Sequence, residues 1–101
     1  MSTLYTGKIV GITFEPNSSN FQKIVEMTKN GPFPEIELRP EPNNKYDPQA
    51  IAVYANNLQV GYIPKEANAP IHAAKGNIKA RVIRFTNFNG LPTGLYIEVT
   101  S

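Results

Sequence analysis

The sequence contains no cysteine, no tryptophan and a single histidine among 101 residues. Without cysteine the chain has no disulfide, no thiol nucleophile and no cysteine-ligated zinc site, a composition that suits a reducing compartment. The histidine, His72, has no second histidine or cysteine with which to share a transition metal. We therefore expect His72 to lie on a helix surface, and we expect no metal and no cofactor.

Long apolar runs and a charge surplus are also missing. No stretch approaches the roughly 20 apolar residues that cross a bilayer, and the N-terminus does not read as a secretory signal. We expect a cytoplasmic protein without a membrane segment. Lys and Arg total 10 against 8 for Asp and Glu, which gives a net charge of +2. This surplus is too small to indicate nucleic-acid binding by charge alone. With 41% hydrophobic residues, the chain is expected to form one globular domain over residues 1–101.

The motifs of common enzymes are missing as well. There is no glycine-rich phosphate loop of the form G-x-x-x-x-G-K-[ST]. Glu35 and Glu37 share one strand face and are expected to point to water. None of the serines sits in a nucleophile elbow, whether Ser2, Ser18, Ser19 or Ser101. We therefore expect a protein that is not an enzyme.

The residue patterns predict a mainly β fold with two short helices. The helical spacing from Phe21 to Thr28 predicts a first helix that begins at Ser19 or Asn20 and ends at Asn30-Gly31. A second helix is predicted from Pro64 to Lys75, with Gly76 as its cap. Strands are predicted over residues 4–14, 35–39, 50–55, 58–63, 78–85 and 95–100.

Turn residues connect these strands into a compact sheet. Asn56-Asn57 is expected to close a hairpin, because asparagine tolerates positive φ. Gly7 and Gly11 are expected to bend the first strand, and residues 87–94 are expected to form a loop. In the fifth strand, alternation puts Val82 on one face and Phe85 on the other. The sum favours a small six-stranded, strongly bent sheet closed into a barrel.

Two segments carry a family resemblance. Residues 39–54, Arg-Pro-Glu-Pro-Asn-Asn-Lys-Tyr-Asp-Pro-Gln-Ala-Ile-Ala-Val-Tyr, and 60–66, Val-Gly-Tyr-Ile-Pro-Lys-Glu, strongly resemble the HIRAN domain family. The resemblance extends back to Ile-Val-Gly-Ile-Thr-Phe at residues 9–14 and forward to Gly94-Leu95. It implies a small β-barrel related to OB and SH3-like folds, found in certain DNA translocases and as stand-alone bacterial and phage proteins.

The resemblance also implies recognition of DNA, in particular of the free 3′ end of a single strand. Carried over by motif, Asp47 would accept a hydrogen bond from the terminal 3′-hydroxyl. Phe14 and Tyr46 would stack on either side of the terminal base, in a way that tolerates any sequence. Asn44 would offer hydrogen bonds at the loop, and Lys65 would contact a phosphate.

Two departures from the family pattern modify this expectation. Thr13 stands where translocase-linked members tend to carry a basic residue, and Tyr62 stands where a histidine can occur. Both departures weaken the expected grip on phosphate. A further aromatic residue would stack a second base, and Phe85 and Phe88 compete for that role.

Each site residue also has a structural alternative. Asp47 before Pro48 could shape the turn, Phe14 and Tyr46 could pack against the domain, and Lys65 could be a solvated side chain. The leading hypothesis is a monomer that binds single-stranded DNA at its 3′ end, with a possible protein partner in DNA processing. The alternative is an adaptor β-barrel that binds proteins and has lost recognition of DNA ends.

Overall fold

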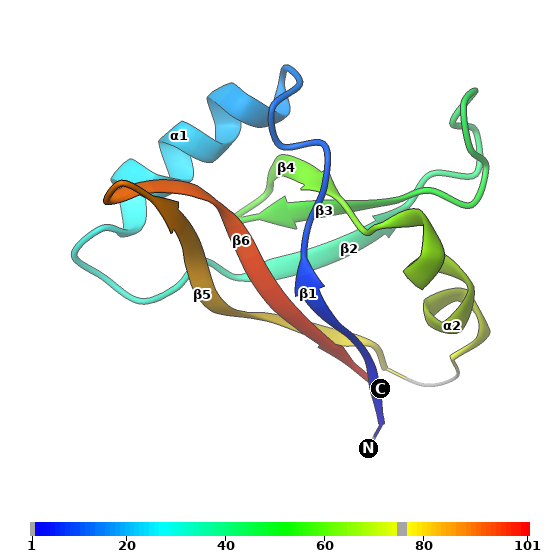
Figure 1. Cartoon of the computed structure of the whole chain (residues 1–101). Coiled ribbons are helices and arrows are strands. Elements are labelled where there is room, and N and C mark those ends of the chain that lie inside the picture. The colour runs from blue at the N-terminus through cyan, green and yellow to red at the C-terminus, as the bar shows by residue number, and fades with distance from the viewer. Residues whose placement is uncertain (1, 75–76) are drawn as a thin grey trace.

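The computed structural model describes residues 2–74 and 77–101, which form two three-stranded antiparallel sheets with two helices (Figure 1). The elements in chain order are β1 (Thr3–Lys8), α1 (Asn17–Thr28), β2 (Ile36–Pro40), β3 (Ile51–Ala55), β4 (Leu58–Tyr62), the short 3-10 helix η1 (Lys65–Ala67), α2 (Asn68–Ala73), β5 (Lys79–Phe88) and β6 (Leu91–Thr100). The predicted class, mainly β with six strands and two short helices, is confirmed. In the described residues, no helix is long and apolar enough to cross a membrane.

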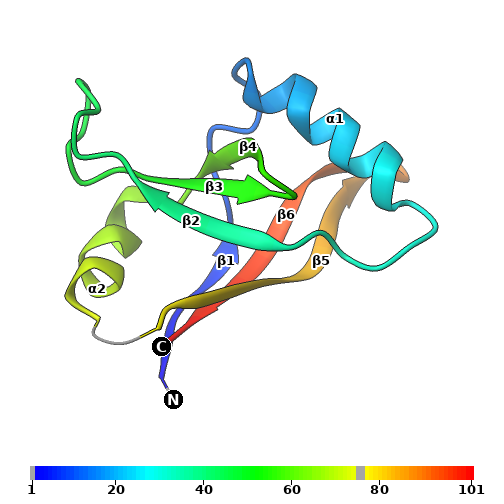
Figure 2. The ribbon, with the colours of Figure 1, turned by 180° about the vertical axis from the view of Figure 1, so that it is seen from behind.

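The sheets have the strand orders β1-β6-β5 and β2-β3-β4, and they meet along one side only. There, Val10 and Tyr62 form an isolated antiparallel bridge that joins the end of the β1 segment to β4. On the other side β2 and β5 face each other, and no ladder joins them in residues 2–74 and 77–101. Figure 2 shows these two edge strands from the back. The bent sheet is thus present, but hydrogen bonds do not close it into the expected barrel.

The core fills the space between the two sheets. Its largest fully buried side chains are Ile24, Ile51, Val53, Val60, Leu95, Ile97 and Val99. Leu95, Ile97 and Val99 alternate with partly exposed residues along β6, as the two-residue period of a half-buried strand requires. This buried interior lies beneath the loops at the ends of the strands.

The central hairpin agrees closely with its prediction. The predicted strands at 35–39, 50–55 and 58–63 appear as β2, β3 and β4. Asn56 and Asn57 both have positive φ, 47° and 69°, as a two-residue turn of the I′ kind needs. Asn56 also joins the hairpin to the start of β2, because its Oδ1 accepts a hydrogen bond from the Glu35 N–H at 2.9 Å.

The first strand and the first helix differ from their predictions. The strand expected over residues 4–14 ends at Lys8, because Gly11 adopts a φ of 75° and turns the chain. The helix begins at Asn17, earlier than Ser19, and Pro16 is its N-cap residue without a side-chain cap bond. Glu15 supplies that bond instead: its carboxylate accepts hydrogen bonds from Ser18 Oγ and from the Ser19 N–H.

The C-terminal hairpin is longer than predicted. The residues expected to form a loop over 87–94 belong mostly to β5 and β6, which turn at Asn89-Gly90 with φ of 52° and 80°. A shift of register between Val82 and Arg84 reverses the alternation, so Phe85 as well as Val82 packs against the core. The second helix ends at Ala73, and its predicted end at Lys75-Gly76 lies outside the described residues.

Candidate nucleic-acid interface

The β2–β3 loop, residues 41–50, is held together by the side chain of Asn44. Its Oδ1 accepts the backbone N–H groups of Tyr46 (2.9 Å) and Asp47 (3.0 Å). Its Nδ2 donates to Glu41 Oε1 at 3.0 Å, at the base of the loop. Both polar groups of the Asn44 amide are thus engaged within the loop, which gives the residue a structural role in addition to any contact with DNA.

Asp47 ends the same loop with a turn of its own. One carboxylate oxygen, Oδ1, accepts the Gln49 N–H at 2.9 Å, and the Asp47 C=O accepts the Ala50 N–H at 3.0 Å. This is the turn-forming alternative raised by the sequence. The second oxygen, Oδ2, has no hydrogen bond to any residue in the described part of the chain. Asp47 therefore has one oxygen committed to the turn and one available to a ligand.

The side chain of Tyr46 projects from this loop, with 90% of its surface exposed. A large aromatic residue on a loop that is fixed by hydrogen bonds from both sides is a ready surface for stacking. Tyr46 therefore does not pack against the domain, which was the structural alternative for this residue.

The β1–α1 loop, residues 9–16, presents the second exposed aromatic side chain. Phe14 is 72% exposed, and Thr13 beside it is exposed. The loop is tightened by hydrogen bonds to Gly11, whose C=O accepts the Phe14 N–H at 3.3 Å and Asn17 Nδ2 at 3.0 Å. The Phe14 C=O in turn accepts the Ser18 N–H of α1 at 3.1 Å. Phe14 thus stands on a turn that is anchored to the helix.

Tyr62 joins the two loops. Its backbone exchanges two hydrogen bonds of 2.8 Å with Val10, where the β1–α1 loop begins. Its hydroxyl donates to Glu41 Oε1 at 2.8 Å, where the β2–β3 loop begins. Partial burial raises the pKa of the Tyr62 phenol, and the bond to Glu41 adds to the shift. Figure 1 shows the two loops at the top of the molecule, with β3 and β4 below them.

Sequence reasoning missed the role of Glu41 in this arrangement. The Glu41 carboxylate accepts from both Tyr62 and Asn44, so it ties β4 to the interior of the β2–β3 loop. The position of a glutamate three residues before Asn44 was visible in the sequence. The contact with Tyr62 was not, because the two residues are 21 positions apart.

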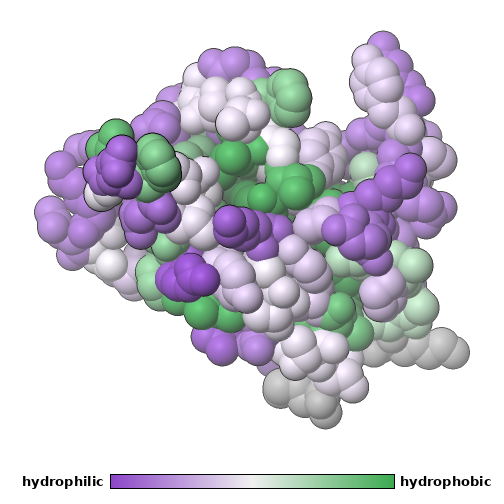
Figure 3. Space-filling view, in the orientation of Figure 1, coloured by the Kyte–Doolittle hydropathy of each residue, from purple (hydrophilic) through white to green (hydrophobic). Residues whose placement is uncertain are grey.

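The charges around the loops are mixed. Lys65 lies in η1, which follows β4 below the β2–β3 loop in Figure 1, and its side chain is exposed. Lys45 is exposed at the tip of the loop. Against these stand the carboxylates of Glu41, Asp47 and Glu15. Figure 3 shows the β2–β3 loop as a projection at the upper right, with apolar surface exposed between it and the rest of that face.

Phe85 and Phe88 do not lie with the other site residues. Phe85 packs against Phe21 and Phe33, with ring centroids 6.1 Å away in each case. Phe88 is 70% exposed near the β5–β6 turn, which Figure 1 places at the side of the molecule opposite the β2–β3 loop. The structure thus places Asn44, Tyr46 and Asp47 on one loop and Phe14 on the neighbouring loop, with Tyr62 bonded to the start of each loop. Both candidates for a second stacking residue lie elsewhere.

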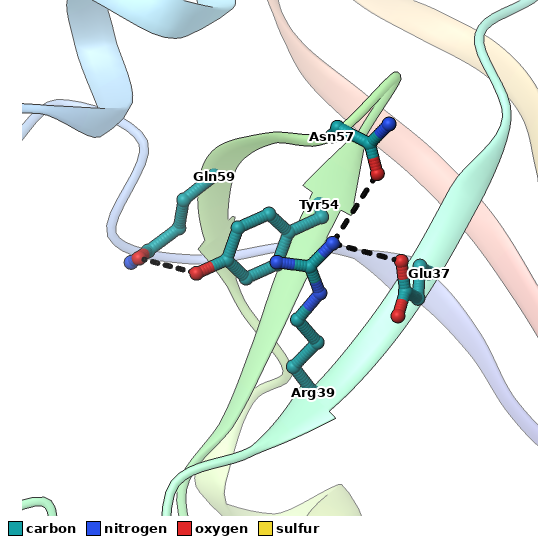
Figure 4. Close-up of polar contacts among 5 residues, drawn as sticks. All are labelled: Glu37, Arg39, Tyr54, Asn57 and Gln59. Atoms are coloured by element: carbon teal, nitrogen blue, oxygen red, sulfur yellow. Dashed lines mark hydrogen bonds and ion pairs between the residues drawn. The ribbon is translucent and has the colours of Figure 1, made fainter.

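A second polar cluster lies on the outer face of the β2–β3–β4 sheet (Figure 4). The Arg39 guanidinium lies 3.8 Å from the centre of the Tyr54 ring and donates to Glu37 Oε1 at 3.0 Å. It also donates to Asn57 Oδ1 at 3.2 Å. The bond to Arg39 lowers the pKa of the exposed Glu37 carboxyl. The Arg39 guanidinium thus makes its contacts within this sheet.

His72 also has a partner in the fold, since its Nε2 lies 2.8 Å from the Gln49 C=O.

The described residues hold no group of three or more His, Cys, Asp and Glu side chains that could bind a metal ion. The structure so far defines a small β-rich domain with two exposed aromatic side chains on braced loops at one end. The sequence model of the HIRAN domain matches residues 1–99. The chain therefore belongs to the HIRAN domain family, whose domain is a DNA-binding module and is not catalytic by itself. No curated protein and no solved structure matches the chain.

Proposed function

We propose that this protein binds single-stranded DNA at a free 3′ end, with the terminal nucleotide held between the β1–α1 loop and the β2–β3 loop. The observation that supports this most is the bridge through Tyr62, which connects the supports of two exposed aromatic side chains. Neither loop alone offers two faces for one base. Together they carry Phe14 and Tyr46 on a common frame.

Stacking supplies most of the proposed affinity. Phe14 and Tyr46 are 72% and 90% exposed, so both rings have free faces. Stacking of a base on an aromatic side chain contributes roughly 1–3 kcal/mol and does not depend on sequence. The proposal therefore predicts little base preference.

The free Oδ2 of Asp47 supplies the proposed recognition of the 3′ end. A carboxylate accepts a hydrogen bond from a hydroxyl and repels a phosphate. Since Oδ1 is held by the Gln49 N–H, the carboxylate is oriented before DNA arrives. This preorganisation favours a strand that ends in a 3′-hydroxyl over one that ends in a 3′-phosphate.

Lysine contacts to phosphate are proposed to be few. Lys45 on the β2–β3 loop and Lys65 in η1, both exposed, are the two cations proposed to contact phosphate. Two phosphate contacts on a single strand give a slope of about −1.4 in a plot of log K against log salt. The affinity should then fall about 7-fold between 50 and 200 mM salt.

Fluorescence anisotropy with two eight-nucleotide strands, one ending in 3′-hydroxyl and one in 3′-phosphate, tests this proposal. We expect tighter binding of the 3′-hydroxyl strand by the wild-type protein. Asp47→Asn keeps Oδ1 for the Gln49 N–H but replaces Oδ2 by an amide N–H₂, so the preference should disappear while the fold is retained. Asp47→Ala removes the turn bond as well. Equal binding of both strands by the wild type would refute recognition of the 3′ end.

Glu26→Gln is the matched control for Asp47→Asn. Glu26 is an exposed carboxylate on α1 that pairs with Lys29 at 3.2 Å, far in sequence from both loops. The same change from carboxylate to amide there should leave the preference for 3′-hydroxyl unaltered. If Glu26→Gln reduced the preference as much as Asp47→Asn, net charge rather than a specific contact would explain it.

One observation favours the adaptor alternative. The Tyr62 hydroxyl is bonded to Glu41, and the carboxylates of Glu41 and Asp47 lie where a phosphate grip would need positive charge. Absence of DNA binding at 50 mM salt, with the fold intact, would support a protein-binding role for the same two loops.

A further inference from the structure

A groove lies between the two edge strands β2 and β5, which no ladder joins in the described residues. The groove has a volume of about 910 Å³ and is lined on one wall by β2 residues and on the other by β5 residues. Ile51 and Ile71 contribute to its apolar lining, together with Ile36, Leu38, Ala80 and Val82 of the two strands. None of Phe14, Asn44, Tyr46 and Asp47 lines it, so it is separate from the proposed DNA site.

The edge of β2 that faces away from β3 presents backbone groups that have no partner in residues 2–74 and 77–101. The Glu35 C=O and the Glu41 N–H both bond toward the β3 side, at 2.9 Å to Asn56 and Ala50. The β2–β3 register has no irregularity between these positions. Because backbone groups alternate in direction along a strand, the N–H and C=O groups of Ile36 and Leu38 point away from β3.

The edge of β5 presents the same kind of groups. Ser2 and Ser101 exchange backbone hydrogen bonds at 3.3 and 2.9 Å, so odd-numbered residues of β6 point toward β1. Even-numbered residues, Glu98 among them, point toward β5, and Glu98 is opposite Arg81. The register is regular from Lys79 to Val82. The backbone groups of Ala80 and Val82 therefore point away from β6.

These two edges determine what fits the groove. Leu38 and Ala80 offer backbone donors and acceptors from opposite walls, above a floor of apolar side chains. Nucleic acid does not match a floor of apolar side chains. An extended polypeptide matches the floor and the strand edges, because its backbone pairs with the edges and its alternate side chains point into the floor.

Width and charge refine the fit. The Cα atoms of β2 and β5 approach within 8 Å where the strands are closest. A strand inserted between two others needs about 10 Å, so it does not fit at this closest approach. The two ribbons diverge toward α2 in Figure 2, so we expect an added strand to pair at that end, where the edges lie further apart. Glu35 on β2 and Lys79 on β5 line the groove without an ion-pair partner in the described residues. They favour a peptide with a basic residue beside β2 and an acidic residue beside β5.

We propose that the groove between β2 and β5 is a docking site for an extended peptide segment of another protein, which adds a strand at Leu38 and Ala80. The segment has apolar side chains at alternate positions and charged residues of both signs between them. Free strand edges are otherwise a risk of aggregation. The proposal does not rest on DNA binding and can hold if DNA binding fails.

Amide hydrogen exchange measured by NMR tests this with the intact chain. In the free protein, the Leu38 and Ala80 amides should exchange at least 10-fold faster than those of Arg39 and Arg81, which point into the sheets. The probes are octapeptides with Val, Ile or Thr at alternate positions and Lys and Glu between them. We expect slower exchange at Leu38 and Ala80 when a probe is bound, and no change at Tyr46 and Asp47.

Two controls make the result decisive. The same octapeptides with N-methylated backbone amides should bind at least 10-fold more weakly. Ala80→Leu, which fills the groove, should do the same while leaving DNA binding unchanged. The proposal is overturned if no probe binds at millimolar concentration or if methylated probes bind equally well. It is also overturned if an oligonucleotide or a second copy of the chain protects these amides instead.

Discussion

Replacing Tyr62 by phenylalanine tests whether the two loops share one support. The substitution keeps the ring and the two backbone bonds to Val10, and removes only the hydroxyl that donates to Glu41 at 2.8 Å. A hydrogen bond to a charged group contributes about 1.5–3 kcal/mol. Glu41 is half-exposed and keeps the bond from Asn44, so we expect a loss below that range, about 1 kcal/mol.

The predicted loss is measurable by thermal unfolding and by binding. A loss of about 1 kcal/mol lowers the Tm of a domain this size by about 4–8 °C. If the whole loss appears as disorder of the β2–β3 loop in the free protein, DNA affinity falls about 5-fold. Burial, with help from Glu41, raises the Tyr62 pKa above its unfolded value. The contribution of the neutral Tyr62 phenol to the free energy of unfolding is present below about pH 10 and is lost as pH rises through the folded pKa. The free energy of unfolding of Tyr62→Phe should therefore fall less steeply with pH in alkali than that of the wild type.

Tyr54→Phe is the matched control for Tyr62→Phe. The Tyr54 hydroxyl lies 3.5 Å from Gln59 Oε1, which is too long for a strong bond (Figure 4). The free energy of unfolding of Tyr54→Phe should differ from that of the wild type by less than about 0.5 kcal/mol. If Tyr62→Phe behaved like Tyr54→Phe in both Tm and DNA affinity, the proposed support through Glu41 would be refuted.

Three further predictions concern other parts of the domain. Phe85→Ala should cost about 3 kcal/mol in chemical denaturation and leave the preference for 3′-hydroxyl unchanged, whereas loss of that preference would return Phe85 to the DNA site. Gly61→Ala should cost about 2 kcal/mol, because an added Cβ would lie 2.6 Å from the Val10 C=O; an unchanged Tm would contradict that clash. Hydrogen bonds from Ser19 and Ser18 lower the Glu15 pKa, so this contribution to stability is present above the unfolded pKa and is lost as pH falls through the folded one. An NMR titration should show Glu15 ionising below the ordinary glutamate value, and a midpoint at or above that value would contradict these bonds.

Local chemistry was enough to predict the central hairpin. Asn56-Asn57 favours positive φ, and the flanking strands alternate cleanly, so β3 and β4 follow from neighbours in sequence. The two exposed aromatic residues were identified through the resemblance to HIRAN domains, and the structure agrees that neither packs in the core. In these regions the local preference and the tertiary fold coincide.

Tertiary contacts account for the parts that were not predicted. The β1 strand ends early because Gly11 turns the chain toward Asn17, a contact that propensity does not encode. An irregular register after Val82 turns Phe85 toward Phe21 and Phe33, whereas simple alternation had placed Phe85 opposite Val82. The barrel stays open because no backbone pairing joins β2 to β5 in the described residues, which no local pattern could reveal.

The central claim is that Phe14 and Tyr46 act on one nucleotide, and a double-mutant cycle measures this directly. Affinity for the 3′-hydroxyl strand is determined for the wild type, Phe14→Ala, Tyr46→Ala and the double variant. Two rings on one base should show a coupling energy of about 1 kcal/mol or more. Tyr46→Ala combined with Phe88→Ala, which removes a distant exposed ring, should be additive within about 0.5 kcal/mol. Additivity for Phe14 and Tyr46 as well would contradict the claim that the two loops form one site.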